Sequence, residues 1–120
     1  MVRDNSVVAI DTASNRVIST FKTNAGPNGM AFSPDHQRIY ITDVFANQLQ
    51  VLTLATGDVS QGVDVGEKPG FIRLTPDGSH GYFVRPYGDT VSVIDIRTLS
   101  IVDTIKVDKG PSTVAICGAP

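Results

Sequence analysis

The sequence predicts an all-β chain in which one 42-residue unit recurs in tandem. Three kinds of element return at this interval or at twice this interval. They are the prolines Pro27, Pro69 and Pro111, the turn tripeptides Ser33-Pro34-Asp35 and Thr75-Pro76-Asp77, and the apolar segments at residues 5–11 and 89–95. A fixed period of this length is typical of solenoids, propellers and arrays, whose units bury their apolar surface only by stacking on one another. We therefore expect a row of similar β-sheets.

Each unit reads as a four-stranded antiparallel meander. Turn residues fall about every ten positions, and the segments between them are short, rich in β-branched residues and alternating in polarity, which is strand spacing. In the middle copy the pattern predicts strands at residues 30–33, 38–43, 48–54 and 59–64. These are the first, second, third and outer strands of the unit.

The turns have residues suited to their backbone. Proline and aspartate in the first-to-second turn fix φ and accept hydrogen bonds from nearby backbone N–H groups. The third-to-fourth turn opens with Asp11 in the first copy and Asp95 in the last. Leu99 stands where the other copies have Asn15 and Gly57, so we expect a strained backbone there.

Four aligned columns are apolar in every copy, and the pattern predicts that they form the core. The columns are Met30, Ile72 and Val114; Phe32, Leu74 and Ile116; Val7, Leu49 and Val91; and Ala9, Val51 and Val93. Sheets with apolar residues on both faces, repeated in tandem, indicate β-propeller blades. Known propellers close with about four to eight blades, so two complete units and parts of two others predict an open arc or partial propeller.

Composition favours a folded chain, with 41% hydrophobic and 18% charged residues and a mean hydropathy of +0.04. The net charge is -2, and no cluster of basic and aromatic residues indicates nucleic-acid binding. No apolar run has the about 20 residues of a membrane span, and no secretory leader is visible. Cys117, alone in an apolar strand, is interpreted as a small buried hydrophobe.

Four elements, in order and in phase, resemble the YVTN-type β-propeller repeat. They are Ile39-Tyr40-Ile41-Thr42-Asp43, Val91-Ser92-Val93-Ile94-Asp95, Gly110-Pro111 and Thr75-Pro76-Asp77-Gly78. Arg85 stands where the pattern has Asn, and Thr53 replaces the Asp of the third strand. The resemblance covers essentially the whole chain and implies bacterial or archaeal periplasmic or surface proteins with binding functions. Related folds also serve lactonases and redox enzymes, and the resemblance transfers no catalytic motif.

No catalytic, metal or cofactor motif stands out from the residues themselves. His36 and His80 fall in first-to-second turns, where a solvated turn residue is the favoured interpretation. The acid pairs Asp4 with Asp11 and Asp103 with Asp108 are explained by turns and edges. We therefore predict no catalytic residue, no metal site and no cofactor.

One end of the predicted sheets carries candidate binding residues. In a meander the fourth-to-first loops share a face with the second-to-third loops. This face holds Asp43, Lys68, Arg85 and Tyr87, while Arg73 replaces alanine on an innermost strand. An Arg that pairs with an acid or reaches channel water explains Arg73 without a ligand, and contact with an anion is the alternative.

The domain interpretation is a single partial propeller over residues 1–120. Residues 1–26 end a first blade, 27–68 and 69–110 form the second and third, and 111–120 begin another. We predict a non-enzymatic binding scaffold, part of a larger propeller, that contacts further blades or another protein and self-associates through exposed blade faces. The alternatives are a fragment of a lactonase-like or redox propeller enzyme and a structural cell-surface repeat protein.

Overall fold

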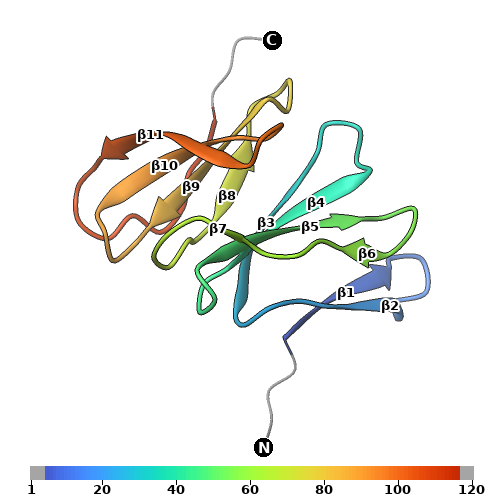
Figure 1. The fold of residues 1–120 in the computed structure, drawn as a ribbon. Helices are drawn as coiled ribbons and strands as arrows, with labels where there is room; N and C mark the ends of the chain where they lie inside the picture. Colours follow the sequence, from blue (N-terminus) through green and yellow to red (C-terminus); the bar gives the residue numbers. More distant parts are fainter. Residues whose placement is uncertain (1–4, 117–120) are drawn as a thin grey trace, which may run out of the picture.

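The computed structural model describes residues 5–116 as antiparallel β-sheets without a helix in that range (Figure 1). The first blade is the hairpin of β1 (Ser6–Asp11) and β2 (Arg16–Lys22). The second contains β3 (Pro27–Phe32), β4 (Arg38–Asp43), β5 (Gln48–Thr53), β6 (Asp58–Val59) and β7 (Val63–Asp64). The third contains β8 (Ile72–Leu74), β9 (His80–Arg85), β10 (Thr90–Asp95) and β11 (Ser100–Lys106). The all-β fold class predicted from the repeats is therefore confirmed.

Strand order follows the chain, as a meander requires. The third blade pairs in the order β8, β9, β10, β11, and the second pairs β3, β4 and β5 before its outer strand. The predicted second strand at residues 38–43 coincides with β4, whereas the first strand begins earlier, at Pro27. Pro27 tolerates this place because the first residue of a strand need not donate to the ladder.

The outer strand of every blade slips by one residue against its neighbour. The slip leaves Ile18 unpaired in β2 and Val102 unpaired in β11. In the second blade the same slip divides the predicted strand at residues 59–64 into β6 and β7. Ser60 lies at this break, where its hydroxyl accepts a hydrogen bond from the Val51 N–H at 2.8 Å. The repeat unit thus includes a β-bulge at a constant position.

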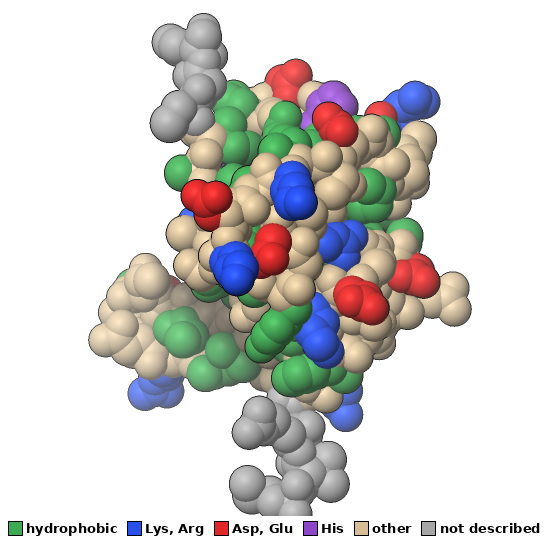
Figure 2. Space-filling model, turned by 90° about the vertical axis from the view of Figure 1, so that its left-hand side faces the viewer, with side chains coloured by type: hydrophobic (Ala, Val, Ile, Leu, Met, Phe, Trp, Pro, Cys, Tyr) green, Lys and Arg blue, Asp and Glu red, His purple; other side chains and the backbone are tan. Residues whose placement is uncertain are grey.

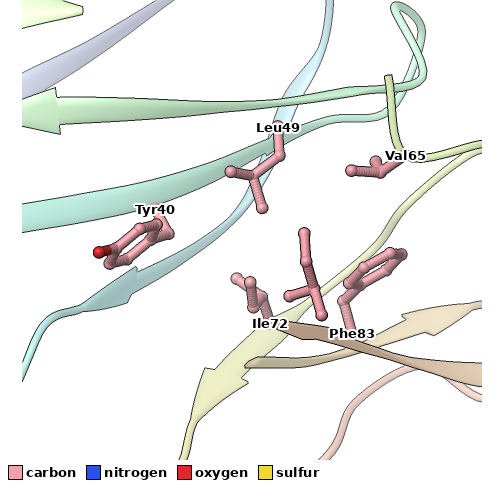
Figure 3. Close-up of a cluster of buried hydrophobic side chains, with 6 residues drawn as sticks. Tyr40, Leu49, Val65, Ile72 and Phe83 are labelled. Carbon is pink, nitrogen blue, oxygen red and sulfur yellow. The ribbon is translucent and has the colours of Figure 1, made fainter. Parts of the chain in front are cut away.

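The main core lies between the second and third blades. Figure 3 shows side chains from β4, β5, β8 and β9 that point toward one another. Its buried members are Tyr40, Leu49, Val65, Ile72, Phe83 and Ile94. Because neither sheet buries its apolar face alone, this contact is what joins the blades.

A second core joins the first blade to the second, through Val7, Ile39, Ile41 and Leu52. The predicted core columns are only partly buried here. Met30 and Phe32 are 48% and 54% exposed, so their expected burial is wrong in this structure. The reason is that the first blade has two strands in the described range, and neither covers these side chains.

The turns adopt the left-handed conformations that the alignment predicted. Leu99 has φ of 56°, close to Asn15 at 58° and Gly57 at 75°. The Leu99 side chain packs against the main core, which offsets part of the cost of a left-handed leucine. The predicted strain at this position is confirmed.

The remaining predictions on the fold lie at the chain ends. Residues 111–116 form no strand, because no neighbouring strand pairs with them in the described part of the chain. Asp4 and Cys117 lie outside the described residues. Within residues 5–116, no helix is long and apolar enough to cross a membrane.

Candidate functional site

A cleft of about 680 Å³ lies where the loops of the blades meet. The second-to-third loops and the fourth-to-first loops both contribute to it, as the meander topology predicts. Its lining residues are Asn5, Gly26, Pro27, Asn28, Val44, Phe45, Lys68, Gly70, Pro86 and Tyr87. The face predicted from the sequence therefore contains a concave surface.

Two aromatic side chains stand at this cleft at equivalent repeat positions. Phe45 is 69% exposed and Tyr87 is 81% exposed, and they are separated by one repeat interval. Exposed aromatic rings are costly to hydrate and are common where a protein contacts a ligand or partner. The prediction named Tyr87 and missed Phe45. The 42-residue alignment of the two rings was the signal that could have found it.

The backbone under the cleft is held by one interaction that repeats in each blade. The side chains of Asn5, Asn47 and Asp89 each accept a hydrogen bond from the backbone N–H 21 residues later, at 3.1, 2.9 and 2.9 Å. Their backbone carbonyls each accept a second bond, from the residue 18 positions later. We call this pair of bonds the Asx clamp. It fixes the fourth-to-first loop to the start of the third strand.

Lys68 supplies the cationic side chain of the cleft lining. Its backbone N–H donates to Asn47 Oδ1 in the Asx clamp. The φ of Lys68 is 44°, and the residues at the same repeat position, Gly26 and Gly110, also have positive φ. The left-handed backbone at a non-glycine residue costs about 1 kcal/mol. The ordinary residue for this turn is glycine, so the lysine keeps a charge at the cleft at some cost in stability.

The blades approach closely beside the cleft. Thr42 Oγ1 accepts from the Gly29 N–H at 2.9 Å and donates to the Gly70 carbonyl at 2.8 Å. A Cβ at Gly29 would lie 2.6 Å from that carbonyl, so only glycine fits there. This buried bond joins the second blade to the third at Gly70, a residue of the cleft lining.

Arg85, also predicted as a site residue, is committed to the protein. Its Nε donates to Ser92 Oγ at 2.8 Å and its Nη1 to the Glu67 carbonyl at 2.6 Å. Its Nη2 donates to the Val65 carbonyl. Desolvation lowers the pKa of the guanidinium, while the Glu67 and Asp64 carboxylates oppose that shift. The side chain thus ties the last loop of the second blade to the third.

Asp43 occupies the same repeat position as Arg85 but has no such partners. Its side chain is fully buried, and neither carboxylate oxygen has a hydrogen-bond partner among the described residues. Burial raises the pKa of the Asp43 carboxyl from its usual 3.8 to about 6. Asp43 is not part of the cleft lining.

Arg73 lies apart from the cleft. It lines a different hollow together with Pro34, His36 and Pro76 of the first-to-second turns, and its Nη1 donates to the Ile72 carbonyl at 3.1 Å. Of the five predicted residues, the structure therefore brings together Lys68 and Tyr87, buries Asp43, holds the partly buried Arg85 in hydrogen bonds to the protein, and places Arg73 in another hollow.

The histidines make local contacts at the turns. The His36 ring packs edge-on against Phe32 with centroids 5.4 Å apart, and His80 Nδ1 lies 2.9 Å from Ser79 Oγ. Within residues 5–116, no group of three or more His, Cys, Asp or Glu side chains is arranged to hold a metal ion. The cleft lining combines two aromatic side chains, three asparagine or lysine side chains and prolines.

No protein-family model matches the sequence, and no curated protein matches it. Solved structures are similar. The chain matches hydrazine synthase from Kuenenia stuttgartiensis with a TM-score of 0.81 and 22% identity, over 91% of this chain and 32% of that chain. It matches AztD from Citrobacter koseri with a TM-score of 0.74 and 16% identity, over 92% of this chain and 32% of that chain.

A luciferin-regenerating enzyme is also similar, with a TM-score of 0.76 and 19% identity, over 94% of this chain and 40% of that chain. These neighbours are β-propeller proteins, and the likeness identifies the present fold as part of a propeller. The chain spans 32–40% of the length of these three structures.

Proposed function

We propose that this chain is a binding scaffold within a larger β-propeller, and that its loop-face cleft takes a small, ring-bearing anion. The observation that carries the proposal is the pair of exposed aromatic rings, Phe45 and Tyr87, at equivalent positions of two blades beside one cleft. Propellers offer such loops on a rigid frame, which keeps the cost of ordering the site low.

The ligand class follows from the lining. Aromatic and proline rings stack on planar or apolar rings, and Lys68 supplies a positive charge for a carboxylate or another anion. Asn5 and Asn28 add amide groups that hydrogen-bond polar substituents. A neutral ring would gain binding free energy from stacking alone, without the contribution of the Lys68 charge.

Benzoate and its neutral analogue benzamide are the probes. In nuclear magnetic resonance titrations we expect benzoate to shift the signals of Phe45, Lys68 and Tyr87, and benzamide to bind more weakly. The Tyr87→Ala and Phe45→Ala variants should each lose about tenfold in affinity, equivalent to about 1.4 kcal/mol. Both side chains are exposed, so the fold should persist.

The charge is tested by Lys68→Gln, which should bind benzoate and benzamide with equal affinity. The matched control is Arg73→Gln, which removes a cation from the other hollow and should leave the preference for benzoate unchanged. Equal binding of the two probes by the parent chain, or loss of the preference in Arg73→Gln alone, would contradict the proposal.

Membership of the YVTN-type repeat family is part of the same proposal, supported by the four in-phase elements of the sequence and by the propeller neighbours. We place the protein in the periplasm or at the cell surface on this resemblance. On the face in Figure 2, basic side chains are interspersed with acidic and hydrophobic ones. Nucleic-acid binding uses a continuous basic patch, so this surface supports partners other than nucleic acid.

The second candidate is a blade segment of a propeller enzyme. It is favoured by the names of three neighbours, namely hydrazine synthase, luciferin-regenerating enzyme and dihydro-heme d1 dehydrogenase NirN. In that case the catalytic groups lie outside residues 5–116. The reading frame around this sequence would discriminate, because an enzyme should carry clustered metal or haem ligands in other blades.

A further inference from the structure

The sequence contains one Asn-Gly dipeptide, Asn28-Gly29, and it lies at an irregular point of β3. In the ladder with β4, Pro27 faces Asp43 and Gly29 faces Thr42, so Asn28 is the extra residue of a β-bulge. Because glycine has no side chain, the backbone nitrogen that follows Asn28 is sterically open. This nitrogen can attack the Asn28 side-chain amide whenever the backbone is free to turn toward it.

The Thr42 side chain holds this nitrogen in place. In a regular ladder a backbone N–H donates to a carbonyl of the neighbouring strand, whereas the Gly29 N–H donates to Thr42 Oγ1 at 2.9 Å. The same hydroxyl donates to the Gly70 carbonyl of the third blade at 2.8 Å, which fixes its position. Both hydrogen bonds are buried. The conformation of the dipeptide therefore depends on one hydroxyl group.

The next repeat has neither the dipeptide nor the hydroxyl. Gly70-Phe71 stands at the position of Asn28-Gly29, and Val84 stands at that of Thr42. There the Gly70 N–H donates to the Val84 carbonyl at 2.8 Å, and the Val84 N–H donates to the Phe71 carbonyl at 3.1 Å. The third blade thus forms without a side-chain bond at this point. The hydroxyl accompanies the Asn-Gly dipeptide and is not a requirement of the blade.

We propose that Asn28 is a site of spontaneous covalent modification, and that the Thr42 hydroxyl sets the rate at which its amide becomes a carboxylate. The Gly29 nitrogen loses its proton to a solvent base and attacks Asn28 Cγ. A bond forms between these two atoms, the bond from Cγ to Nδ2 breaks, and Nδ2 takes up a proton and leaves as ammonia. Water then opens the cyclic imide at either of its carbonyls, which gives aspartate or isoaspartate at position 28.

The products fit this place less well than asparagine does. Isoaspartate adds a methylene group to the main chain, and Gly29 has little space for a shift, because a Cβ there would already lie 2.6 Å from the Gly70 carbonyl. Both products also place a carboxylate in the cleft lining that contains Lys68. Modification should therefore weaken the contact between the second and third blades and offset the positive charge of the cleft. The inference does not depend on the ligand proposed for the cleft.

The test follows the full chain by peptide mass spectrometry during incubation at pH 8, in buffer and in urea that unfolds it. The other asparagines are internal controls, because none precedes a glycine; they are Asn5, Asn15, Asn24 and Asn47. In urea, Asn28 should exchange amide for carboxyl faster than these controls. In the folded chain its rate should be at least about tenfold lower than in urea, because reaction requires local opening. The rate should also fall from pH 8 to pH 6, since the attacking nitrogen must lose its proton.

Two substitutions at position 42 separate the hydrogen bond from packing. Thr42→Ser keeps the hydroxyl and should keep the slow rate, whereas Thr42→Val keeps the branched shape and should react about tenfold faster in the folded state. The matched control is Ile72→Ala, which weakens the same junction without removing the Gly29 bond. Urea denaturation gives the unfolded fraction of each variant. The Ile72→Ala rate should follow that fraction, and the Thr42→Val rate should exceed it.

Three results would overturn the proposal. The first is an Asn28 rate in urea no higher than that of the other asparagines, which would remove the site itself. The second is an equal Asn28 rate in the folded and unfolded parent chain, a comparison that needs no variant. The third is a Thr42→Val rate equal to that of Thr42→Ser or fully accounted for by its unfolded fraction, which would assign the protection to the fold as a whole.

Discussion

Replacing Asp43 with asparagine should stabilise the protein at neutral pH. The Asp43 carboxyl is fully buried without a described hydrogen-bond donor, and burial raises its pKa from 3.8 to about 6. One pKa unit corresponds to about 1.36 kcal/mol, so keeping this group charged in the folded state costs about 3 kcal/mol at pH 7. An amide of the same shape carries no such charge penalty.

The pH dependence has a defined sign. Between pH 3.8 and about 6 the folded state binds more protons at Asp43 than the unfolded state does. The contribution of Asp43 to the free energy of unfolding therefore falls as pH rises through this window, and it is constant above it. The Asp43→Asn variant lacks this fall, so the difference between variant and parent should grow from about 0.5 kcal/mol at pH 4 to about 3 kcal/mol at pH 7.

Urea denaturation followed by circular dichroism, at fixed protein concentration and several pH values from 4 to 8, measures this difference. The control is Asp58→Asn, which neutralises an exposed aspartate of the same blade. A constant difference between Asp43→Asn and the parent across this range, or a less stable variant at pH 7, would refute the reasoning.

Three further predictions concern packing, backbone and charge. Ile72→Ala should lower the free energy of unfolding, measured by urea denaturation, by about 2–5 kcal/mol. Met30→Ala, at the equivalent but half-exposed position, should lower it by less than about 1 kcal/mol, and equal losses would contradict the assigned core. Lys68→Gly should raise the free energy of unfolding by about 0.5–1 kcal/mol by relieving its left-handed backbone, and a loss would show that the lysine side chain outweighs that strain. Hydrogen bonds from Ser79 and Thr75 lower the pKa of Asp77 to about 2, so the stabilisation by the Asp77 carboxylate should be present above pH 3.8 and be lost as pH falls toward 2. In Asp77→Asn the free energy of unfolding should therefore decrease less on acidification, and an unchanged acid transition would count against these bonds.

The sequence predicts the sheets well because their determinants are local and repeated. β4 coincides with its predicted range, and the left-handed φ of Leu99 follows from the alignment with glycine and asparagine. The division of the outer strand into β6 and β7 was not predicted. A one-residue slip leaves composition and approximate alternation unchanged, so a short polar strand such as residues 59–64 gives no clear signal of it.

The candidate site could be predicted only in part. Topology places Lys68 and Tyr87 on one face, and both line the cleft. Asp43 and Arg85 are the last residues of strands that end at the same face, but the sequence does not show that Asp43 is buried or that Arg85 is held by hydrogen bonds. Arg85 is satisfied by carbonyl groups of residues 65 and 67, a contact between blades that the order of residues alone does not reveal.

The bulge in each outer strand affects whether a further strand can pair with the outer edge of the sheet. Because the slip at Ile18 and Val102 interrupts the outermost ladder, this rim is a poor template for a further strand. Addition of sheets is then confined to the tangential direction, in which one blade stacks on the next. A strand that approached this rim would meet an interrupted row of backbone donors and acceptors, so the bulge protects the protein against edge-to-edge aggregation.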